Sequence, residues 1–365
     1  MFSNFDRFAM TRALELAARG METTDPNPRV GCVVARGDRV IGEGWHQKAG
    51  EAHAEVAALA TVREDLAGST VYVTLEPCSH YGRTPPCANA LIEARIGRVV
   101  FAVGDPDPRV AGKGAAALQE AGIRVESGLM ETEAAELNIG YLGRIRDGRP
   151  WLRLKLAMSL DGRTALANGV SQWITGEEAR VDVQHWRARS SAILTGAGTV
   201  LSDDPRLDVR LPPEDRRQPM RVILDSRLRT PPGARLLQTG GDVLILTSPE
   251  ADLPRVQALE ERGAQVETMP LVEGRIDLVS MVERLAELQA NEVLVEAGPT
   301  LAGQLLRYTL VDEVLLYVAP KLLGPQARAL VDMTRLDYLE NAPEFSLEGV
   351  KKLGGDLCLR LRPRL

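Results

Sequence analysis

Apolar residues recur with helical spacing in some stretches of the chain and with strand-like spacing in others. The first stretch has helical spacing as far as Ala17 and stops at Gly20, so Asp6 is expected to cap a helix there. Residues 29–46 contain two β-rich runs around a Gly-Asp turn, which predicts a hairpin. Helices are then expected at 53–62, 87–96, 113–121 and 137–145, and strands at 70–75, 98–103 and 123–126. Alternating strands and helices predict a mostly parallel sheet covered on both faces.

A second series of elements follows the sequence RDGRP at 146–150, whose composition is typical of a linker. Thr175 and Glu178 have the spacing of a capping box, for a helix that ends near Ser190. Strands are expected at 151–162, 192–196, 221–226, 242–248, 292–298 and 312–320, and a further helix at 278–289. The pattern therefore predicts two α/β domains, 1–146 and 151–365.

Composition and charge narrow the range of partners. The chain has 365 residues, of which 44% are hydrophobic, so it can bury a sizeable core. It carries 50 acidic against 44 basic residues, and the net charge of -6 opposes binding to a polyanion. The amphipathic, charged start of the chain gives no signal peptide or membrane segment, so the cytoplasm is the expected location. We expect a homo-oligomer that acts on a small molecule, with neither nucleic acid nor membrane as a partner.

The sequence EPCSHYGRTPPC, from Glu76 to Cys87, contains two cysteines separated by eight residues. Only 4 cysteines in the whole chain do not form a disulfide scaffold, and a reducing compartment would keep them as thiols. His53, Cys78 and Cys87 each lie at an expected strand-to-helix transition, where α/β proteins place their sites. Two thiolates and one imidazole leave the fourth tetrahedral position of zinc to water, as in catalytic zinc sites.

Glu55 follows His53 by two residues, which in mid-helix would direct the two side chains to different sides. We therefore expect His53 to start the helix, so that Glu55 faces the metal and passes a proton from water to a leaving amine. H-x-E followed by P-C and a second cysteine is typical of zinc deaminases, although nucleic-acid deaminases usually have P-C-x-x-C. The longer loop predicts extra substrate contacts, with His80, Arg83 and Thr84 as candidates; His80 is a loop or substrate residue rather than the third ligand.

Two other functions are compatible with these residues. A nucleic-acid deaminase would use the second half for docking, but the negative charge and the 4% aromatic content argue against it. A zinc-stabilised binding protein without activity would leave Glu55 without a role.

In the second half, the GAGTVL sequence at 196–201 lacks the third glycine of the standard dinucleotide fingerprint. Two strand-to-helix junctions, with Thr199 and Thr300, are therefore only candidate phosphate sites.

Longer motifs resemble the RibD family of bifunctional riboflavin-biosynthesis enzymes. In the first half these motifs are TTDPNPRVGCVV, GWHQKAGEAHAEV and VTLEPCSHYGRTPPCANALI. In the second half they are KLAMSLDGRTA, SQWIT, SDDPRL and VEAGPTLAGQLL, so the resemblance covers essentially the whole chain. It implies a cytidine-deaminase-like three-layer α/β/α domain followed by a dihydrofolate-reductase-like α/β domain, with zinc and NADPH as cofactors.

The resemblance also implies two consecutive reactions. The substrate, 2,5-diamino-6-(5-phosphoribosylamino)pyrimidin-4-one, would lose an amine by hydrolysis, and NADPH would then reduce its ribosyl side chain to ribityl. Metal ligands would be His53, Cys78 and Cys87, with Glu55 as the catalytic residue. In the same domain three more residues are candidate substrate contacts, each with an ordinary structural alternative: Asn27 for ribose or base, and His46 and Lys48 for the phosphate end.

Matching motifs carry two sets of binding residues onto the second half. The resemblance assigns to NADPH the residues Ala157, Trp173, Thr199, Asp203, Ser226, Gly298, Pro299, Thr300, Leu301, Ala302, Gly303 and Gln304. It assigns to the substrate Ser171, Arg187, Leu207, Arg210 and Glu296. The guanidinium forks of Arg187 and Arg210 suit the substrate phosphate.

No residue in this sequence stands out as an obligatory acid for hydride transfer to the ring-opened, imine-like sugar. Alignment of hydride donor and acceptor is therefore expected to provide most of the catalysis. Glu296 is expected to orient the substrate, and Asp203 is the second candidate for proton transfer. Lys155 is expected either to hold the end of its strand or to line the site. Asp161 is expected to form a turn.

Overall fold

The computed structural model describes residues 1–79, 86–213, 216–333 and 335–364. These residues form two compact units, Met1–Gly148 and Arg149–Leu365. The predictions for His80, Arg83 and Thr84 lie outside the described residues. Within the described ranges, no helix combines the length and the apolar composition that crossing a bilayer requires.

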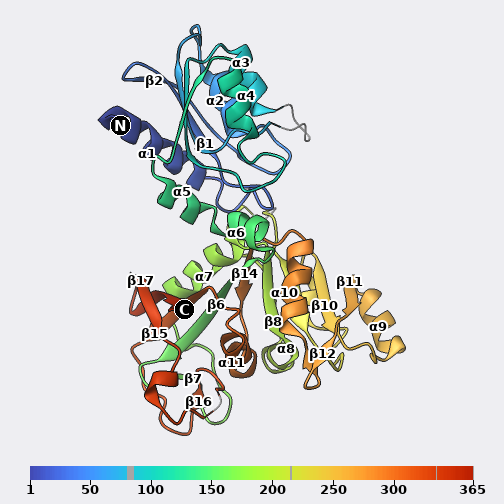
Figure 1. The fold of residues 1–365 in the computed structure, drawn as a ribbon. Coiled ribbons are helices and arrows are strands. Elements are labelled where there is room, and N and C mark those ends of the chain that lie inside the picture. The colour runs from blue at the N-terminus through green and yellow to red at the C-terminus, as the bar shows by residue number, and fades with distance from the viewer. Residues whose placement is uncertain (80–85, 214–215, 334, 365) are drawn as a thin grey trace. The chain divides into compact units, whose positions relative to one another are not determined.

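The first unit has three layers, with a five-stranded sheet in the middle (Figure 1). The strand order is β2-β1-β3-β4-β5; β1 runs antiparallel to both neighbours, and β3, β4 and β5 are parallel. The strands are β1 (Gly31–Arg36), β2 (Arg39–Trp45), β3 (Thr70–Leu75), β4 (Arg98–Val103) and β5 (Arg124–Ser127). The helices are α1 (Asn4–Ala18), α2 (Ala54–Thr61), α3 (Cys87–Glu93), α4 (Lys113–Glu120), α5 (Glu131–Leu137) and α6 (Ile139–Asp147).

Both faces of this sheet are buried. Val33 and Tyr72 belong to the core under α1 and α5, whereas Val34 and Val73 belong to the core under α2, α3 and α4. Figure 1 shows the same division, with α1 and α5 on one side of the strands and α2, α3 and α4 on the other. Burial on both faces explains the continuous apolar composition of β3 and β4. The predicted hairpin and the doubly covered sheet are confirmed, but the sheet is mixed rather than mostly parallel, because β1 pairs antiparallel with both neighbours.

The start of α1 differs from the prediction. Ser3 is the N-cap; its hydroxyl accepts a hydrogen bond from the Asp6 N–H at 3.0 Å, and the Asp6 carboxylate accepts one from the Ser3 N–H at 2.7 Å. The same carboxylate accepts hydrogen bonds from the Tyr72 hydroxyl and from Arg98, both at 2.6 Å. Asp6 therefore links the helix to the sheet, a role that depends on distant residues and that local spacing does not reveal.

The second unit contains a nine-stranded sheet of order β11-β10-β9-β8-β14-β6-β15-β18-β17. Neighbours from β11 to β15 are parallel, whereas β18 is antiparallel to both β15 and β17. The strands are β6 (Trp151–Ser159), β8 (Ala192–Gly196), β9 (Met220–Leu224), β10 (Val243–Thr247), β11 (Ala264–Thr268), β14 (Glu292–Val295), β15 (Glu313–Ala319), β17 (Phe345–Leu353) and β18 (Asp356–Pro363). The helices are α7 (Glu177–Arg189), α8 (Ala197–Asp203), α9 (Leu253–Glu260), α10 (Leu278–Glu287) and α11 (Pro299–Arg307).

Small elements complete the unit. They are the ribbon of β7 (Arg163–Ala165) with β16 (Arg328–Ala329), the hairpin of β12 (Leu271–Val272) with β13 (Arg275–Ile276), and the 3₁₀ turns η1 (Arg235–Gln238) and η2 (Leu339–Asn341). Helices α10 and α11 pack on one face of the large sheet, and α7, α8 and α9 pack on the other. The predicted strands at 151–162, 192–196, 221–226, 242–248, 292–298 and 312–320 correspond to β6, β8, β9, β10, β14 and β15.

The capping box predicted at Thr175 does not form. The N-cap of α7 is Gly176, which has no side chain to cap with, and its N–H donates instead to the Asp356 carboxylate at 2.6 Å. Asp356 begins β18, in a hairpin with β17 that the sequence pattern did not predict. Most residues of this hairpin are at least partly exposed, so its apolar pattern is weak.

Candidate active sites

His53, Cys78 and Cys87 meet in the first unit. His53 is the N-cap of α2, Cys78 follows β3, and Cys87 is the first residue of α3. Their potential ligand atoms all lie within 4.8 Å of one another, with 3.1 Å between His53 Nδ1 and Cys87 Sγ. One imidazole and two thiols at this separation match the donor set of a catalytic zinc site, which leaves one position open. The structure thus brings together the three residues that the sequence singled out as ligands.

The surroundings of Cys78 favour its thiolate, the form that binds metal. The Cys87 N–H donates to Cys78 Sγ at 3.3 Å, and Cys78 Sγ lies 3.5 Å from His53 Nδ1. The hydrogen bond with the Cys87 side chain lowers the pKa of the Cys78 thiol, and the interaction with His53 lowers it further. One thiolate is therefore available in this cluster at neutral pH.

Glu55 lies in the first turn of α2, two residues after the N-cap His53, as expected from the H-x-E spacing. The side chain is buried; Glu55 is only 4% exposed. Burial raises the pKa of Glu55 to about 7, and the nearby Cys78 thiolate contributes in the same direction. A carboxyl group with such a pKa can both accept and release a proton near neutral pH.

Of the three further contacts proposed for this unit, two lie beside the cluster. The His46 and His53 rings are 5.6 Å apart, and His46 Nε2 is 3.0 Å from Asn27 Nδ2. The other ring nitrogen of His46 contacts the Ala52 carbonyl at 3.0 Å, and burial lowers the pKa of His46, which favours its neutral form. Lys48 is exposed to solvent.

The loop after β4 supports Cys78 through residues to which the sequence analysis gave no role. Glu76 is buried, and its carboxylate accepts N–H bonds from Gly112 at 3.1 Å and from Ala115 at 3.3 Å. Gly114 packs so closely on this segment that an added Cβ would lie 1.9 Å from the Pro77 carbonyl oxygen. The Gly-Lys-Gly sequence at 112–114 is the sequence feature that could have indicated this contact, because glycine permits such a close approach of two backbone segments.

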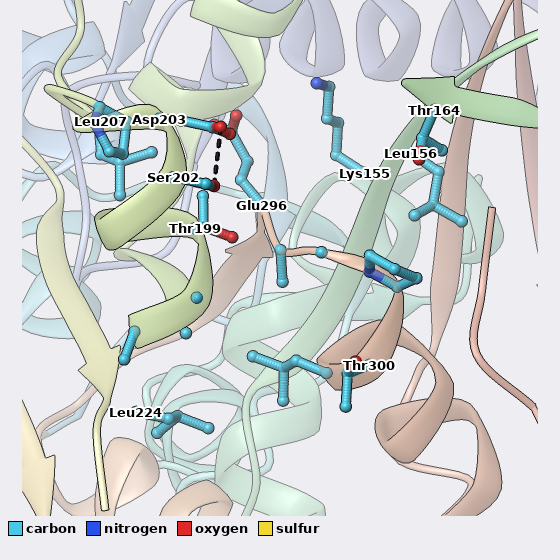
Figure 2. Close-up of a pocket in the computed structure, with 18 of the residues that line it drawn as sticks. Lys155, Leu156, Thr164, Thr199, Ser202, Asp203, Leu207, Leu224, Glu296 and Thr300 are labelled. Carbon is cyan, nitrogen blue, oxygen red and sulfur yellow. Dashed lines mark hydrogen bonds between the residues drawn. The ribbon is translucent and has the colours of Figure 1, made fainter. Parts of the chain in front are cut away.

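A large pocket lies in the second unit where β6, β8, β9 and β14 end (Figure 2). Its volume is about 1620 Å³, above the usual range for one small ligand, so it has room for a dinucleotide together with a second molecule. The starts of α8 and α11 contribute Thr199 and Thr300 (Figure 2). Glycines 196, 198 and 298 leave the backbone accessible at these junctions, which suits the phosphates of a dinucleotide.

Nearly all residues assigned to the reductase site by resemblance line this pocket. Those expected to contact NADPH and found there are Ala157, Trp173, Thr199, Asp203, Ser226, Gly298, Pro299, Thr300, Leu301 and Gln304. Those expected to contact the substrate and found there are Ser171, Arg187, Leu207, Arg210 and Glu296. Ala302 and Gly303 are not part of the lining: Ala302 is in the core, and Gly303 packs against the Asp332 carbonyl, 1.9 Å from where its Cβ would be.

Glu296 and Arg187 form a bidentate ion pair in the pocket, with N–O distances of 2.6 and 2.9 Å. Although burial opposes ionisation of Glu296, the charge of Arg187 and then that of Lys155 keep the pKa of Glu296 below its usual value. Figure 2 shows Lys155 on β6 and Glu296 after β14, and both side chains extend to the same side of the pocket. Burial lowers the pKa of Lys155, so its ammonium group releases a proton more readily than an exposed lysine.

Arg187 and Arg210, both expected to bind the substrate phosphate, have different partners in the pocket. Two nitrogens of Arg187 are occupied by Glu296, and the third donates to the Asp208 carbonyl at 3.0 Å. Three of its five N–H donors are therefore engaged within the protein. The Arg210 side chain is 52% exposed and pairs with the Asp208 carboxylate through Nη1 at 2.7 Å, so it keeps other donors for a ligand.

Two acidic residues of this unit have different environments. Asp161 accepts N–H bonds from Leu323 at 3.1 Å and from Gly324 at 2.7 Å, which confirms its structural role in a turn. Asp203 is exposed and accepts a hydrogen bond from Ser202 at 2.8 Å (Figure 2).

Lys155 lines the pocket. Of the two roles expected for it, holding the end of its strand or lining the site, the structure supports the second.

Two family models match this chain, one in each half. Residues 3–103 match the family model of the cytidine and deoxycytidylate deaminase zinc-binding region, and residues 150–359 match that of the RibD C-terminal domain. The chain is 49% identical to the riboflavin biosynthesis protein RibD of Escherichia coli over 98% of its length and 99% of that protein's. The Haemophilus influenzae protein of the same name is 46% identical, covering 100% of this chain and 99% of its own.

Solved structures show the same relationship in three dimensions. Acinetobacter baumannii RibD superposes with a TM-score of 0.92 at 46% identity, with 99% of both chains covered. A deaminase/reductase from Thermotoga maritima gives a TM-score of 0.86 at 34% identity, again over 99% of both chains. The expected cytidine-deaminase-like and reductase domains are thereby confirmed, as are zinc and NADPH as cofactors. The chain belongs to the RibD family of bifunctional enzymes, which act in riboflavin biosynthesis as a deaminase and a reductase.

Proposed function

We propose that residues 1–146 form a deaminase domain whose zinc ligands are His53, Cys78 and Cys87. The observation that carries this proposal is the convergence of the three ligand atoms within 4.8 Å, beside a buried glutamate. Zinc held by such a set would activate a water molecule for attack on a ring carbon that bears an amine. His46 and Asn27, next to the cluster, are the candidate contacts for the substrate.

Glu55 moves the proton in this reaction. It takes a proton from the attacking water and transfers it to the exocyclic nitrogen, so that the carbon–nitrogen bond breaks and ammonia leaves. The pKa of about 7 suits both steps, because the same carboxyl group must accept and then release a proton. The proposed substrate is 2,5-diamino-6-(5-phosphoribosylamino)pyrimidin-4-one, since the Thermotoga maritima relative is named a diaminohydroxyphosphoribosylaminopyrimidine deaminase.

Residues 151–365 form the proposed reductase domain, in which NADPH would supply hydride to the anomeric carbon of the opened sugar. The loop that starts α11, with Gly298 and Thr300, provides the place for the pyrophosphate. Glu296 is held as an anion by Arg187 and orients the substrate. Arg210 is our first candidate for the substrate phosphate, because its side chain is 52% exposed against 11% for Arg187 and fewer of its donors are engaged.

Lys155 is our candidate for the group that donates a proton to the imine nitrogen when hydride reaches the anomeric carbon. Its side chain is partly buried, lines the pocket and interacts with the charge of Glu296, and its lowered pKa favours release of that proton. Asp203, the alternative considered from the sequence, is exposed and therefore less suited to controlled proton delivery.

Incubation of the purified chain with the diamino substrate tests both halves together. We expect the mass of the deaminated compound without NADPH, and that of the ribityl product with it. Turnover of NADPH on the non-deaminated compound at an equal rate would contradict the proposed order.

Assembly and location are further parts of the proposal. We propose a homo-oligomer, which size-exclusion chromatography with light scattering can test. We also propose that the chain acts in the cytoplasm, where thiols stay reduced and therefore able to bind zinc. Fractionation of producing cells would check this location.

A further inference from the structure

The loop after β9 carries two arginines on the rim of the reductase pocket. Arg227 and Arg229 are exposed, and both line the pocket. Among the residues that the structure describes, neither guanidinium has a carboxylate partner, in contrast to Arg187 and Arg210. Two unpaired guanidinium groups beside a dinucleotide pocket are suited to bind a phosphate.

The backbone of this loop is fixed independently of the two arginines. Leu228, between them, is 1% exposed and packs in the core with Leu236. The Asp225 carboxylate accepts hydrogen bonds from the Thr230 N–H at 2.6 Å and from its hydroxyl at 2.7 Å, which closes the loop. With Leu228 buried and both ends joined, the two flanking side chains are presented at the rim without further ordering of the backbone.

The position of the loop in the sheet identifies the part of the ligand that it meets. Lys155 and Glu296, the groups proposed to act on the substrate, belong to β6 and to the loop after β14. In the strand order β9-β8-β14-β6, the loop after β9 lies three strands away from β6. At about 4.8 Å per strand this is roughly 14 Å, which an extended dinucleotide can span. The adenosine end of the cofactor therefore reaches the loop when its nicotinamide is near Lys155.

Other phosphates of the ligands have separate places in the pocket. The start of α11 is proposed for the pyrophosphate, and Arg210 for the phosphate of the substrate. The phosphate that remains is the one on the 2′-oxygen of the adenosine ribose, which NADPH has and NADH lacks. We propose that Arg227 and Arg229 bind this 2′-phosphate and thereby select NADPH over NADH. The inference rests on the proposed reductase function.

Cofactor binding to the full-length, zinc-loaded chain tests the proposal without turnover. Dissociation constants for NADPH, NADH and 2′,5′-ADP are measured by calorimetry for the wild type, Arg227→Ala/Arg229→Ala and Arg227→Lys/Arg229→Lys. We expect the double alanine variant to bind NADPH and 2′,5′-ADP at least about tenfold more weakly, because charge-assisted contacts to phosphate are lost, while NADH affinity changes little. The lysine variant keeps the charges and should show a smaller loss.

Two control variants locate the effect. Arg255→Ala removes an exposed arginine of α9 outside the pocket and should leave all three constants unchanged. Arg275→Ala removes another pocket arginine, on β13; if that change rather than the loop variant lowers the NADPH affinity, the proposal is wrong. An equal loss for NADPH and NADH, or an unchanged ratio of the two, would also overturn it.

The binding measurements distinguish an error in the proposed reductase function from an error in the role of the two arginines. If the wild type binds neither NADPH nor NADH, the reductase assignment itself fails. If it binds NADPH and the loop variants bind equally well, only the role of Arg227 and Arg229 fails. Because both side chains are exposed, folding of the variants is expected to be intact, and unchanged thermal unfolding checks this.

Discussion

The two sites each contain a largely buried glutamate, and the two carboxyl groups shift in opposite directions. Burial and a neighbouring thiolate raise the pKa of Glu55 to about 7. At Glu296 the cations of Arg187 and Lys155 outweigh burial and lower the pKa. Neighbouring charge, and not burial alone, therefore decides whether a glutamate can exchange protons or stays an anion. Glu55 has the properties of an acid and base, and Glu296 those of a fixed charge.

Loss of a zinc ligand should have the largest effect and should be confined to one site. We expect Cys87→Ser to lose most of its zinc and to reduce ammonia release by more than the roughly 100-fold that loss of an outer-shell partner costs. Zinc content by mass spectrometry and an ammonia assay measure both effects. Cys358→Ser, which changes a buried cysteine of the second unit, is the matched control and should keep its zinc. Full zinc content in the Cys87 variant would contradict its role as a ligand.

Glu55→Gln should separate the chemistry from the metal site. Removing a positioned acid and base is expected to slow deamination by about 10²–10⁴-fold while zinc is retained. Reduction of the deaminated compound by the same sample serves as the internal control and should be unaffected. Deamination at the wild-type rate would show that another group moves the proton.

Lys155→Met tests the other half of the comparison. We expect a loss of about 10²-fold in kcat for NADPH-dependent reduction, at the lower end of the range for proton donors, with deamination unchanged. Lys155→Arg keeps a charge but holds its proton more strongly, so it should rescue substrate binding and KM better than kcat. Steady-state kinetics with the deaminated substrate separates these parameters, and a change in KM alone would assign Lys155 to binding only.

The pH dependence of stability should differ between wild type and Glu55→Gln in zinc-free protein. The pKa of Glu55 is raised in the folded state, so its contribution is fully present below the unfolded value near 4.5 and is lost as pH rises to about 7. The loss is at most about 3.5 kcal/mol, since the shift from 4.5 to about 7 spans 2.5 pKa units of about 1.4 kcal/mol each. Denaturant unfolding between pH 4.5 and pH 7.5 measures it. Parallel curves for the two proteins would indicate that Glu55 is not held in an environment that raises its pKa.

The sequence predicted the deaminase site more completely than the reductase site, and the reason is chemical. Metal ligands must be specific residue types, and the proposed ligands His53, Cys78 and Cys87 lie at element boundaries that hydrophobic patterns locate well. The reductase pocket uses backbone at strand ends and side chains from distant segments, so most of its residues came from family resemblance. The use of the Arg187 fork by Glu296 depends on a contact across 109 positions of the chain, which no local pattern contains.

Prediction of the fold was limited in the same way, by contacts between residues far apart in the sequence. Buried strands and the helices between them follow from apolar periodicity, whereas two helix starts were mistaken. The N-cap of α1 is Ser3 rather than Asp6, and the start of α7 is bound by Asp356 from the far end of the chain. Both errors concern polar groups whose partners are set by tertiary structure.

The closeness of Cys78 and Cys87 has a consequence for handling the protein in air. Their sulfur atoms lie within 4.8 Å of each other, and the lowered pKa of Cys78 keeps one of them in the nucleophilic form. In the proposed zinc site the metal would protect both sulfurs, but in metal-depleted samples an oxidant can join them into a disulfide that would no longer bind zinc. Preparations of the zinc-free chain therefore require a reductant, and a deaminase that has lost activity on storage should regain it with thiol and zinc added together.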